Sequence, residues 1–252
     1  MAKKIILTGA TGLIGSRLCQ ALLEAGHTVI TLSRDRKKLD DLRRGMREAN
    51  DDNFDGYAFE ISDEKAVKKV FARIAKKHRH VDGLINNAGH RIEKVDLDAL
   101  SSQDWLESLK VNVITPFLLS RAAAALMPKH GSIINIGSIF AVVSADLSVY
   151  PKNEKLMGLL TVYGVSKAAL VHLTKYLATA YGRKQIRINA VSYGGVANKQ
   201  QKSFVAKYKK KTAMGRMAEL DDLDGVIKFL ISDDSKYITG QNIVVDGGRT
   251  LY

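Results

Sequence analysis

The chain has 252 residues, with 39 Lys and Arg against 26 Asp and Glu, which gives a formal net charge of +13 and an isoelectric point near 9.7. This length fits one α/β domain with a full core, and a hydrophobic content of 46% argues against disorder. Cys19 is the only cysteine, so an intrachain disulfide and a cysteine-based zinc site are excluded, and we expect no metal.

The N-terminus runs directly into an apolar segment, without the pattern of a signal peptide. No apolar run approaches roughly 18 residues, which argues against a membrane span. Together with the single thiol, these features predict a cytoplasmic protein.

Short β-rich segments alternate with longer helical ones along the chain. The predicted strands are Lys4–Thr8, Thr28–Ser33, Tyr57–Ile61, Gly83–Asn86, Ser132–Gly137, Ile186–Ser192 and Asn242–Asp246. The predicted helices lie near 15–32, 64–78, 102–127, 162–182 and 221–232. Continuous apolar runs in several strands are typical of a parallel sheet buried on both faces. The sequence therefore predicts an α/β, Rossmann-type doubly wound parallel sheet of about seven strands, with helices on both faces, in one domain over residues 1–252.

A glycine-rich turn follows the first strand and precedes an amphipathic helix. It comprises Gly9, Thr11, Gly12, Leu13, Ile14 and Gly15. Glycines let a pyrophosphate approach the backbone, and a helix N-terminus offers it unpaired N–H groups. A tight turn of no function is the simpler alternative, but the strand–turn–helix context favours a dinucleotide site.

The second strand ends at Ser33, where no carboxylate stands, and Arg34 comes next. An acid at such a strand end binds the ribose 2′-hydroxyl, whereas an arginine suits a 2′-phosphate. We therefore expect NADP(H), bound with the help of Ser33, Arg34 and Lys38. NAD(H) stays the alternative, because a small shift of the strand end would make Asp35 the ribose acid.

Tyr163 and Lys167 are spaced to share one face of a helix, where the ammonium lowers the pKa of the phenol. Such a pair alone is common. Here, however, the pair occurs with several other motifs in a characteristic order, namely the glycine turn, Asn86-Asn87-Ala88-Gly89, Asn112, Ser138 and the Asp246-Gly247-Gly248 ending. With these motifs, the sequence resembles the single-domain branch of the short-chain dehydrogenase/reductase family over essentially the whole chain.

This resemblance implies a role for each matching residue. Tyr163 is the general acid/base, Lys167 lowers its pKa and binds the nicotinamide ribose, and Ser138 polarises the substrate carbonyl. Asn112 bends its helix and holds a water in a proton relay. Further cofactor-binding positions are Glu60, Ile61, Asn87, Ala88, Gly89, Gly194 and Val196, and candidate substrate-binding positions are Tyr150, Tyr193 and Asn198.

Three features depart from the pattern of that branch. The spacing of Gly9, Gly12 and Gly15 resembles the extended, nucleotide-sugar-acting branch, although the chain is too short for that branch's substrate domain. Ser138 and Tyr163 are 25 positions apart, so an insertion lies within 141–162, where Tyr150, Lys152 and Asn153 are candidates to border the substrate.

The third departure follows the sixth strand, where Tyr193 replaces the usual proline and Asn198 the usual threonine. Three features carry a further resemblance: the long spacing between Ser138 and Tyr163, residues 194–198 and residues 215–219. Through them, the sequence also resembles oxidoreductases of bacterial surface-sugar gene clusters. Those clusters include ones for flagellin modification and nonulosonic acids.

Positive charge falls into three patches, after the second strand, on the second predicted helix, and over 199–211. The first suits a 2′-phosphate, the second a solvated face, and the third an anionic substrate or simply an exposed loop. No helix-turn-helix or aromatic-interleaved basic stretch supports a nucleic-acid partner. His90 and Arg91 follow the Asn-Asn-Ala-Gly turn and either face the pocket or belong to a plain loop.

The leading hypothesis is an NADP(H)-dependent oxidoreductase that acts on the carbonyl/alcohol pair of a small-molecule substrate, with an anionic sugar derivative as a candidate and no membrane partner. The alternatives are a nucleotide-sugar epimerase or dehydratase with retained cofactor, and a non-catalytic cofactor-binding regulator. The family resemblance also implies a homo-oligomer, a tetramer or dimer, packed through 102–127 and 162–182.

Overall fold

A seven-stranded parallel sheet forms the centre of the computed structural model, which describes residues 2–50, 52–93, 96–151 and 155–251. The strands are β1 (Lys4–Thr8), β2 (Thr28–Ser33), β3 (Phe54–Ala58), β4 (Gly83–Asn86), β5 (Ser132–Ile136), β6 (Arg187–Tyr193) and β7 (Asn242–Val245). Their order is β3-β2-β1-β4-β5-β6-β7, and every neighbouring pair is parallel. The predicted doubly wound parallel sheet is confirmed.

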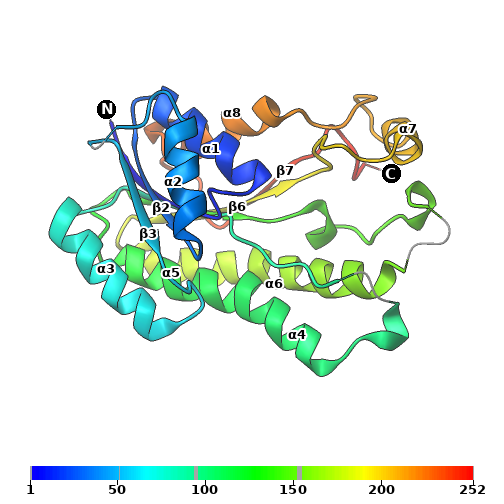
Figure 1. Ribbon diagram of the computed structural model, residues 1–252, viewed down its shortest axis with the longest axis horizontal. Helices are drawn as coiled ribbons and strands as arrows, with labels where there is room; N and C mark the ends of the chain where they lie inside the picture. The colour runs from blue at the N-terminus through cyan, green and yellow to red at the C-terminus, as the bar shows by residue number, and fades with distance from the viewer. Residues whose placement is uncertain (1, 51, 94–95, 152–154, 252) are drawn as a thin grey trace.

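Helices cover both faces of this sheet. They are α1 (Leu13–Glu24), α2 (Arg36–Gly45), α3 (Glu64–His78), α4 (Ser102–Leu109), α5 (Thr115–Ala124), α6 (Met157–Gly182), α7 (Lys202–Lys210) and α8 (Asp224–Ile231). Figure 1 shows α1, α2 and α8 on one side of the sheet and α3, α4, α5 and α6 on the other. Short 3₁₀ turns occupy Leu97–Ala99, Ile139–Ala141, Leu147–Val149, Leu220–Leu223 and Asp233–Ser235, and a π-helical turn occupies Lys110–Ile114.

Each face of the sheet has its own hydrophobic core, as the continuous apolar strands require. Ile6 and Ile133 pack with residues of α3, α5 and α6, whereas Ile5 and Ile134 pack with residues of α1 and α8. Alternate residues of one strand thus enter opposite cores. The topology switches between β1 and β4, so the carboxyl ends of β1, β4, β5 and β6 frame a crevice there.

Several predicted boundaries are wrong. The first helix ends at Glu24 rather than near 32, because Gly26 turns the chain with φ +77° into β2. The third strand covers Phe54–Ala58 rather than Tyr57–Ile61, since the core takes Phe54 and Tyr57 and the register pairs Val29 with Phe54.

Two helices were not predicted, α2 and α7. Each is highly charged and buries a single side chain, Leu39 and Tyr208 respectively, so neither carries the apolar stripe that marks a helix in sequence. The predicted helix 102–127 is instead α4, the π-helical turn and α5, and the predicted helix 162–182 begins earlier, at Met157.

Helix α6 is long and apolar enough, by length and composition, to span a membrane. Half of that apolar window is buried inside the protein, where α6 covers β5 and β6. It also carries the buried Lys167. We therefore assign its hydrophobicity to the core.

Candidate active site

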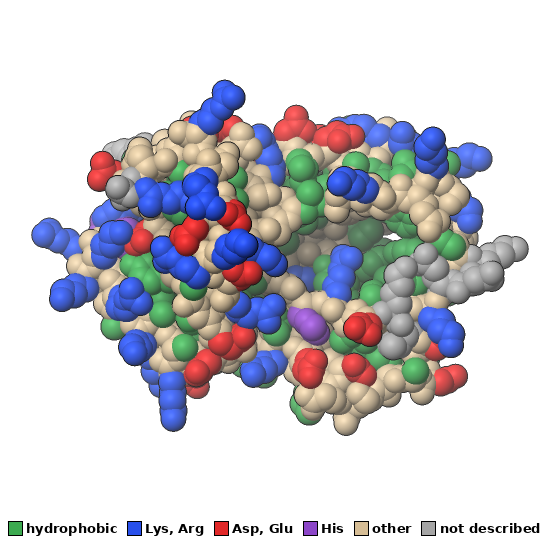
Figure 2. Space-filling view, in the orientation of Figure 1, with side chains coloured by type: hydrophobic (Ala, Val, Ile, Leu, Met, Phe, Trp, Pro, Cys, Tyr) green, Lys and Arg blue, Asp and Glu red, His purple; other side chains and the backbone are tan. Residues whose placement is uncertain are grey.

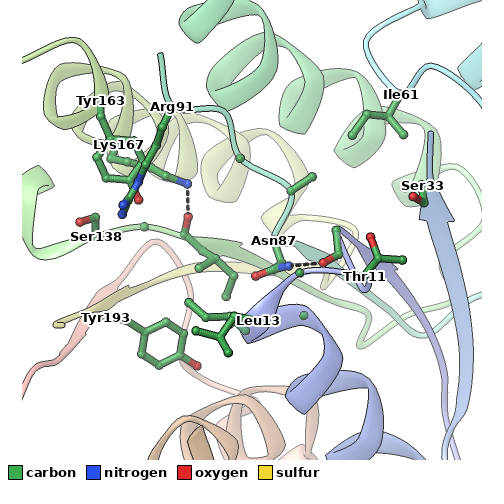
Figure 3. Close-up of a pocket in the computed structure, with 18 of the residues that line it drawn as sticks. Thr11, Leu13, Ser33, Ile61, Asn87, Arg91, Ser138, Tyr163, Lys167 and Tyr193 are labelled. Atoms are coloured by element: carbon green, nitrogen blue, oxygen red, sulfur yellow. Dashed lines mark hydrogen bonds between the residues drawn. The ribbon is translucent and has the colours of Figure 1, made fainter. Parts of the chain in front are cut away.

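A cleft of about 600 Å³ opens at the carboxyl ends of the strands. Figure 3 shows its lining, with Tyr163, Lys167 and Ser138 at one end, Ser33 and Ile61 at the other, and Leu13 and Thr11 of the glycine turn between them. The predicted residues that line it are Gly9, Thr11, Gly12, Leu13, Ile14, Gly15, Ser33, Arg34, Ile61, Asn87, Ala88, Gly89, Ser138, Tyr163, Lys167, Tyr193 and Gly194. The cleft thus joins motifs that lie far apart in the sequence.

The glycine turn adopts a conformation that only glycines permit. Gly9 has φ +66°, and a Cβ on Gly15 would lie 2.0 Å from the Gly9 carbonyl oxygen. Helix α1 begins after Gly12 without a side-chain cap, so its first N–H groups are available at the cleft wall. This turn fits the pyrophosphate of a dinucleotide.

The loop after β4 is fastened to this turn. The Thr8 hydroxyl accepts hydrogen bonds from the backbone N–H groups of Asn87 (3.0 Å) and Ala88 (2.9 Å). The Asn87 amide donates to the carbonyl oxygens of Thr8 (3.0 Å) and Gly9 (3.1 Å). Asn87 therefore holds the two cofactor-facing loops together besides lining the cleft.

At the end of β2, Ser33 and Arg34 line the cleft and Asp35 does not. The Asp35 carboxylate caps α2 by accepting the Lys38 backbone N–H at 3.0 Å. Near this strand end, the predicted cofactor contacts Lys38 and Glu60 do not line the cleft. The Glu60 carboxylate accepts from the Ser62 hydroxyl at 2.8 Å and lies 4.0 Å from the Arg34 guanidinium, while the Lys38 ammonium lies 3.9 Å from Asp35.

Tyr163 and Lys167 lie on successive turns of α6 beside Ser138, which follows β5. The Lys167 ammonium is buried and donates to the carbonyl oxygen of Ile136 at 2.7 Å. It lies 5.7 Å from the centre of the Tyr163 ring. Burial lowers the pKa of Lys167, and the charge of Tyr163 opposes that change.

Burial and three neighbouring side chains act on the Tyr163 phenol. Burial by itself raises the pKa of this phenol, but the positive charges of Lys167 and Arg91 and hydrogen bonds from Arg91 and Ser138 outweigh it. The net effect lowers the pKa of Tyr163 below its ordinary value. The Arg91 guanidinium carbon lies 4.4 Å from the ring centre, and Figure 3 shows its side chain beside Tyr163 and Lys167.

Asn112 is buried behind the cleft rather than in its wall. It lies in the π-helical turn, where the helix is distorted as the family resemblance implies. Its side-chain oxygen accepts the His90 N–H at 2.7 Å, and its amide donates to the Ser166 hydroxyl at 2.9 Å. Asn112 thereby ties the loop after β4 to α6.

Of the two substrate-binding positions predicted near the end of β6, one lines the cleft and the other does not. The Tyr193 ring lines the cleft, but its hydroxyl is buried and donates to the Leu223 carbonyl oxygen at 2.9 Å, so it does not offer that hydroxyl to a substrate. Asn198 is exposed and does not line the cleft, and neither does Val196, which pairs with Ala218. The chain after β6 turns away from the cleft there.

Tyr150 lies in a neighbouring cavity of about 470 Å³, together with Leu147, Pro151 and Met157. Its ring packs against Phe204 with the ring centres 5.2 Å apart. Lys152 and Asn153, the other candidates of this insertion, lie outside the described residues.

Arg91 lines the cleft. From the sequence, it could either face the pocket or belong to a loop without a role in binding. The available signal was its position directly after the Asn-Asn-Ala-Gly turn. Ile136, whose carbonyl oxygen holds Lys167, carried no signal, since any residue type offers that group.

The three basic patches occupy α2, α3 and the α7 region. On α3, Lys68 pairs with Glu64 at 3.2 Å and Arg73 lies over the Tyr57 ring at 5.2 Å. Figure 2 shows Lys and Arg side chains spread over this face among acidic and neutral areas, with a hollow near the middle of the molecule. No continuous basic stripe runs across this face.

Comparison with known proteins places these features in one family. The sequence matches the family described as enoyl-(acyl carrier protein) reductase over residues 9–250. It is 31% identical to a 7alpha-hydroxysteroid dehydrogenase of Bacteroides fragilis, covering 99% of this chain and 95% of the relative. It is 29% identical to the post-translational flagellin modification protein A of Campylobacter coli, covering 99% and 98%.

Solved structures agree with these relatives. A short-chain dehydrogenase from Leptospira borgpetersenii with bound NAD+ is 33% identical, with a TM-score of 0.87 over 99% of this chain and 93% of that one. A blue fluorescent protein from a metagenomic library in complex with NADPH is 25% identical, with a TM-score of 0.84 over 98% of each chain. Both nicotinamide cofactors thus occur among the structural neighbours.

Proposed function

This chain belongs to the short-chain dehydrogenase/reductase family, and we propose that it transfers a hydride between NADP(H) and a carbonyl/alcohol substrate with Tyr163 as the acid/base. Family membership makes it an NAD(P)-dependent oxidoreductase of CH–OH and C=O groups. The observation that carries the proposal is the convergence of Tyr163, Lys167 and Ser138 at one end of a cleft that the glycine turn also lines.

The nicotinamide, when bound, supplies the hydride to the carbonyl carbon or accepts it from the alcohol carbon. Ser138 donates a hydrogen bond to the carbonyl oxygen. Tyr163 gives its phenolic proton to the same oxygen as negative charge develops there. Lys167 and Arg91 stabilise the phenolate that remains, which is consistent with the lowered pKa of Tyr163.

Asn112 acts as a positioning residue in this proposal. Its hydrogen bonds to His90 and Ser166 fix the loop after β4 against α6, the helix that presents Tyr163 and Lys167. A Cβ on Gly89 would lie 3.6 Å from the Asn112 oxygen and 3.7 Å from the Lys167 ammonium. A side chain at position 89 would therefore contact both residues of the relay that the family resemblance implies.

NADP(H) is the proposed cofactor because of the charges at the end of β2. Arg34 lines the cleft and is largely exposed, so its guanidinium is accessible to a 2′-phosphate. Asp35, the residue that would select NAD(H), is engaged in capping α2. The second strand ends where the sequence predicted, at Ser33, which supports the same choice.

An anionic substrate, including an anionic sugar derivative, is the substrate class we propose. The cationic Arg91 in the cleft supports this class, and so do the exposed lysines of α7. The relative named as a flagellin modification protein supports the narrower group that the sequence suggested.

The experiment that tests the function is a measurement of cofactor consumption. A panel of keto-sugar phosphates, nucleotide keto-sugars and oxo acids is incubated with enzyme and NADPH, and oxidised cofactor and alcohol product are both quantified. We expect equal amounts of each. Product without net loss of NADPH, from enzyme that retains its cofactor on purification, would instead assign an epimerase or dehydratase. A cofactor-binding protein that reduces no member of the panel, and converts none of the matching alcohols with NADP+, would contradict the proposed reaction.

A further inference from the structure

Arg91 places a positive charge at the point where the reaction is proposed to occur. Its guanidinium carbon lies 4.4 Å from the centre of the Tyr163 ring, and its positive charge lowers the pKa of the phenol. The residue lines the cleft although much of it is exposed, and Figure 3 shows its side chain extending toward Tyr163 and Ser138. An arriving substrate must therefore meet this guanidinium together with the phenol.

The charge of Arg91 is not balanced within the described part of the chain, where no carboxylate lies within ion-pair distance of it. Two other cations near this end of the molecule are balanced, because Asp146 holds both Lys211 (2.8 Å) and Arg249 (3.2 Å). The guanidinium of Arg249 is also covered by the Tyr208 ring, 5.5 Å from its centre. Among the described residues that line the cleft at its Tyr163 end, Arg91 is thus the exposed cation that has charge left to offer a ligand.

We propose that Arg91 is a specificity-determining residue that binds a carboxylate of the substrate, attached one or two carbon atoms from the reacting carbonyl. This inference rests on the proposed function, since Tyr163 marks where the carbonyl oxygen lies. A guanidinium packed over the Tyr163 ring reaches only groups close to that oxygen. The substrates in question are 2-oxo and 3-oxo acids, sugar acids included, and the corresponding hydroxy acids in the reverse direction.

The charge balance favours a carboxylate over a phosphate. One guanidinium offers one positive charge and a planar pair of N–H donors, which match a carboxylate in charge and in bidentate geometry. A phosphate monoester carries close to two negative charges at neutral pH. Lys167 does not offer the second cation, because its ammonium is buried and bound to the Ile136 carbonyl oxygen.

The neighbouring cavity holds Tyr150, which stands at the end of a row of aromatic rings. The rings of Tyr150, Phe204 and Tyr208 form a row, with successive centres 5.2 and 5.7 Å apart. Tyr150 is close enough to Arg91 for the positive charge to act on its phenol. We infer that the carboxylate binds Arg91 while the remainder of the acid packs toward this row.

Matched substrate pairs separate this role from a general effect on Tyr163. We would measure kcat and KM with NADPH for 2-oxo and 3-oxo acids and for their methyl esters, in wild type, Arg91→Gln, Arg91→Lys and the control Arg183→Gln. Arg183 is exposed beyond the end of α6, so its variant removes the same charge away from the cleft. In parallel, calorimetry would measure binding of each acid to the enzyme–NADP+ complex, a readout that needs no turnover.

We expect wild type and Arg183→Gln to prefer the acids over the esters. Arg91→Gln should lose roughly 10- to 100-fold in kcat/KM for the acids, mostly through KM, because a charged hydrogen bond is removed. Any loss through the pKa of Tyr163 should affect acids and esters equally, so the acid preference itself should collapse in Arg91→Gln and return in part in Arg91→Lys.

Equal losses for acids and esters in Arg91→Gln would overturn the proposal, as would a wild type that binds acids no more tightly than esters. Better turnover of a phosphorylated hydroxyketone, lost in the same variant, would overturn the choice of a carboxylate. Arg91-dependent binding of the acids in the complete absence of hydride transfer would uphold the carboxylate site and reject the proposed function instead.

Discussion

The charges around Tyr163 predict how the reaction depends on pH. Reduction needs the protonated phenol, so kcat/KM for reduction should fall as pH rises through the pKa of Tyr163, which lies below its usual value of about 10. Oxidation needs the phenolate and should rise over the same range. Removing the positive charge in Arg91→Gln should raise the pKa of Tyr163 and move both transitions to higher pH. A profile measured with a neutral substrate checks this, and identical profiles for the two enzymes would contradict the assigned effect of Arg91.

Cofactor choice is also decided by single residues. Arg34→Ser should raise the KM for NADPH by about tenfold or more, because a charged hydrogen bond to the 2′-phosphate is lost, and should leave the KM for NADH nearly unchanged. Lys38→Ser is the matched control, because Lys38 does not line the cleft and should matter little. Steady-state kinetics with both cofactors tests this, and a wild type that prefers NADH would contradict it.

At this scale the sequence predicted residues tied to a motif and missed residues placed by loop geometry. Gly9, Ser138 and Tyr163 each follow from a local pattern, and all three line the cleft. Asn198 and Val196 were placed there by analogy of position alone, but the chain turns away after Gly194. The position of Arg91 depends on how Asn112 holds the loop after β4. Asn112 lies 21 positions from Arg91 along the chain, so no local sequence pattern encodes this contact.

Among the elements, the π-helical turn Lys110–Ile114 contributes most to the site. It turns Asn112 inward, where the side chain makes hydrogen bonds to Ser108, Ser166 and both backbone groups of His90. The turn therefore connects α4, α6 and the loop that carries Arg91.

Asn112→Ala should lower the free energy of unfolding by about 2–4 kcal/mol, because it leaves buried partners without hydrogen bonds. It should also lower kcat, because the loop after β4 loses its attachment to α6. Gln103→Ala, which removes an exposed amide from α4, should change neither. Chemical denaturation and kinetics of the two variants test this, and an Asn112→Ala protein of wild-type stability would contradict the structural role.

The helices and strands that could be predicted from the sequence are those rich in apolar residues. Strands such as β1 and β5 are continuous apolar runs, and their predicted positions hold within a residue. The helices α2 and α7 are stabilised by other means, in α2 by the Asp35 cap, and were missed. β3 lies at the sheet edge with partly exposed residues, so its pattern did not fix its boundaries.

For the molecule as a whole, the net charge of +13 is divided among patches with separate surroundings. On α3, Lys68 and Lys77 pair with neighbouring carboxylates, whereas Arg34 and Arg91 line the cleft. This distribution supports a proposed phosphorylated cofactor and an anionic substrate rather than a nucleic-acid partner.

Exposed apolar side chains on α4, α5, α6 and the turn between them predict self-association. They are Leu106, Ile114, Phe117, Val165 and Tyr176. We expect a dimer or tetramer through these helices, since burying such a surface is favourable. Light scattering should show the mass of an oligomer for the wild type. The control Tyr237→Glu should give the same mass, because its exposed ring lies on another segment. The double variant Phe117→Glu, Val165→Glu should give a smaller mass. A monomeric wild type would contradict this expectation.

The central claim is that Tyr163 transfers the proton while the cofactor transfers the hydride. The most direct test is turnover by Tyr163→Phe, which removes only the phenolic oxygen, alongside a fluorescence titration of NADPH binding. We predict a fall in kcat of roughly 100- to 10,000-fold with unchanged affinity for NADPH. Turnover close to that of wild type, in a variant that binds NADPH normally, would contradict the account.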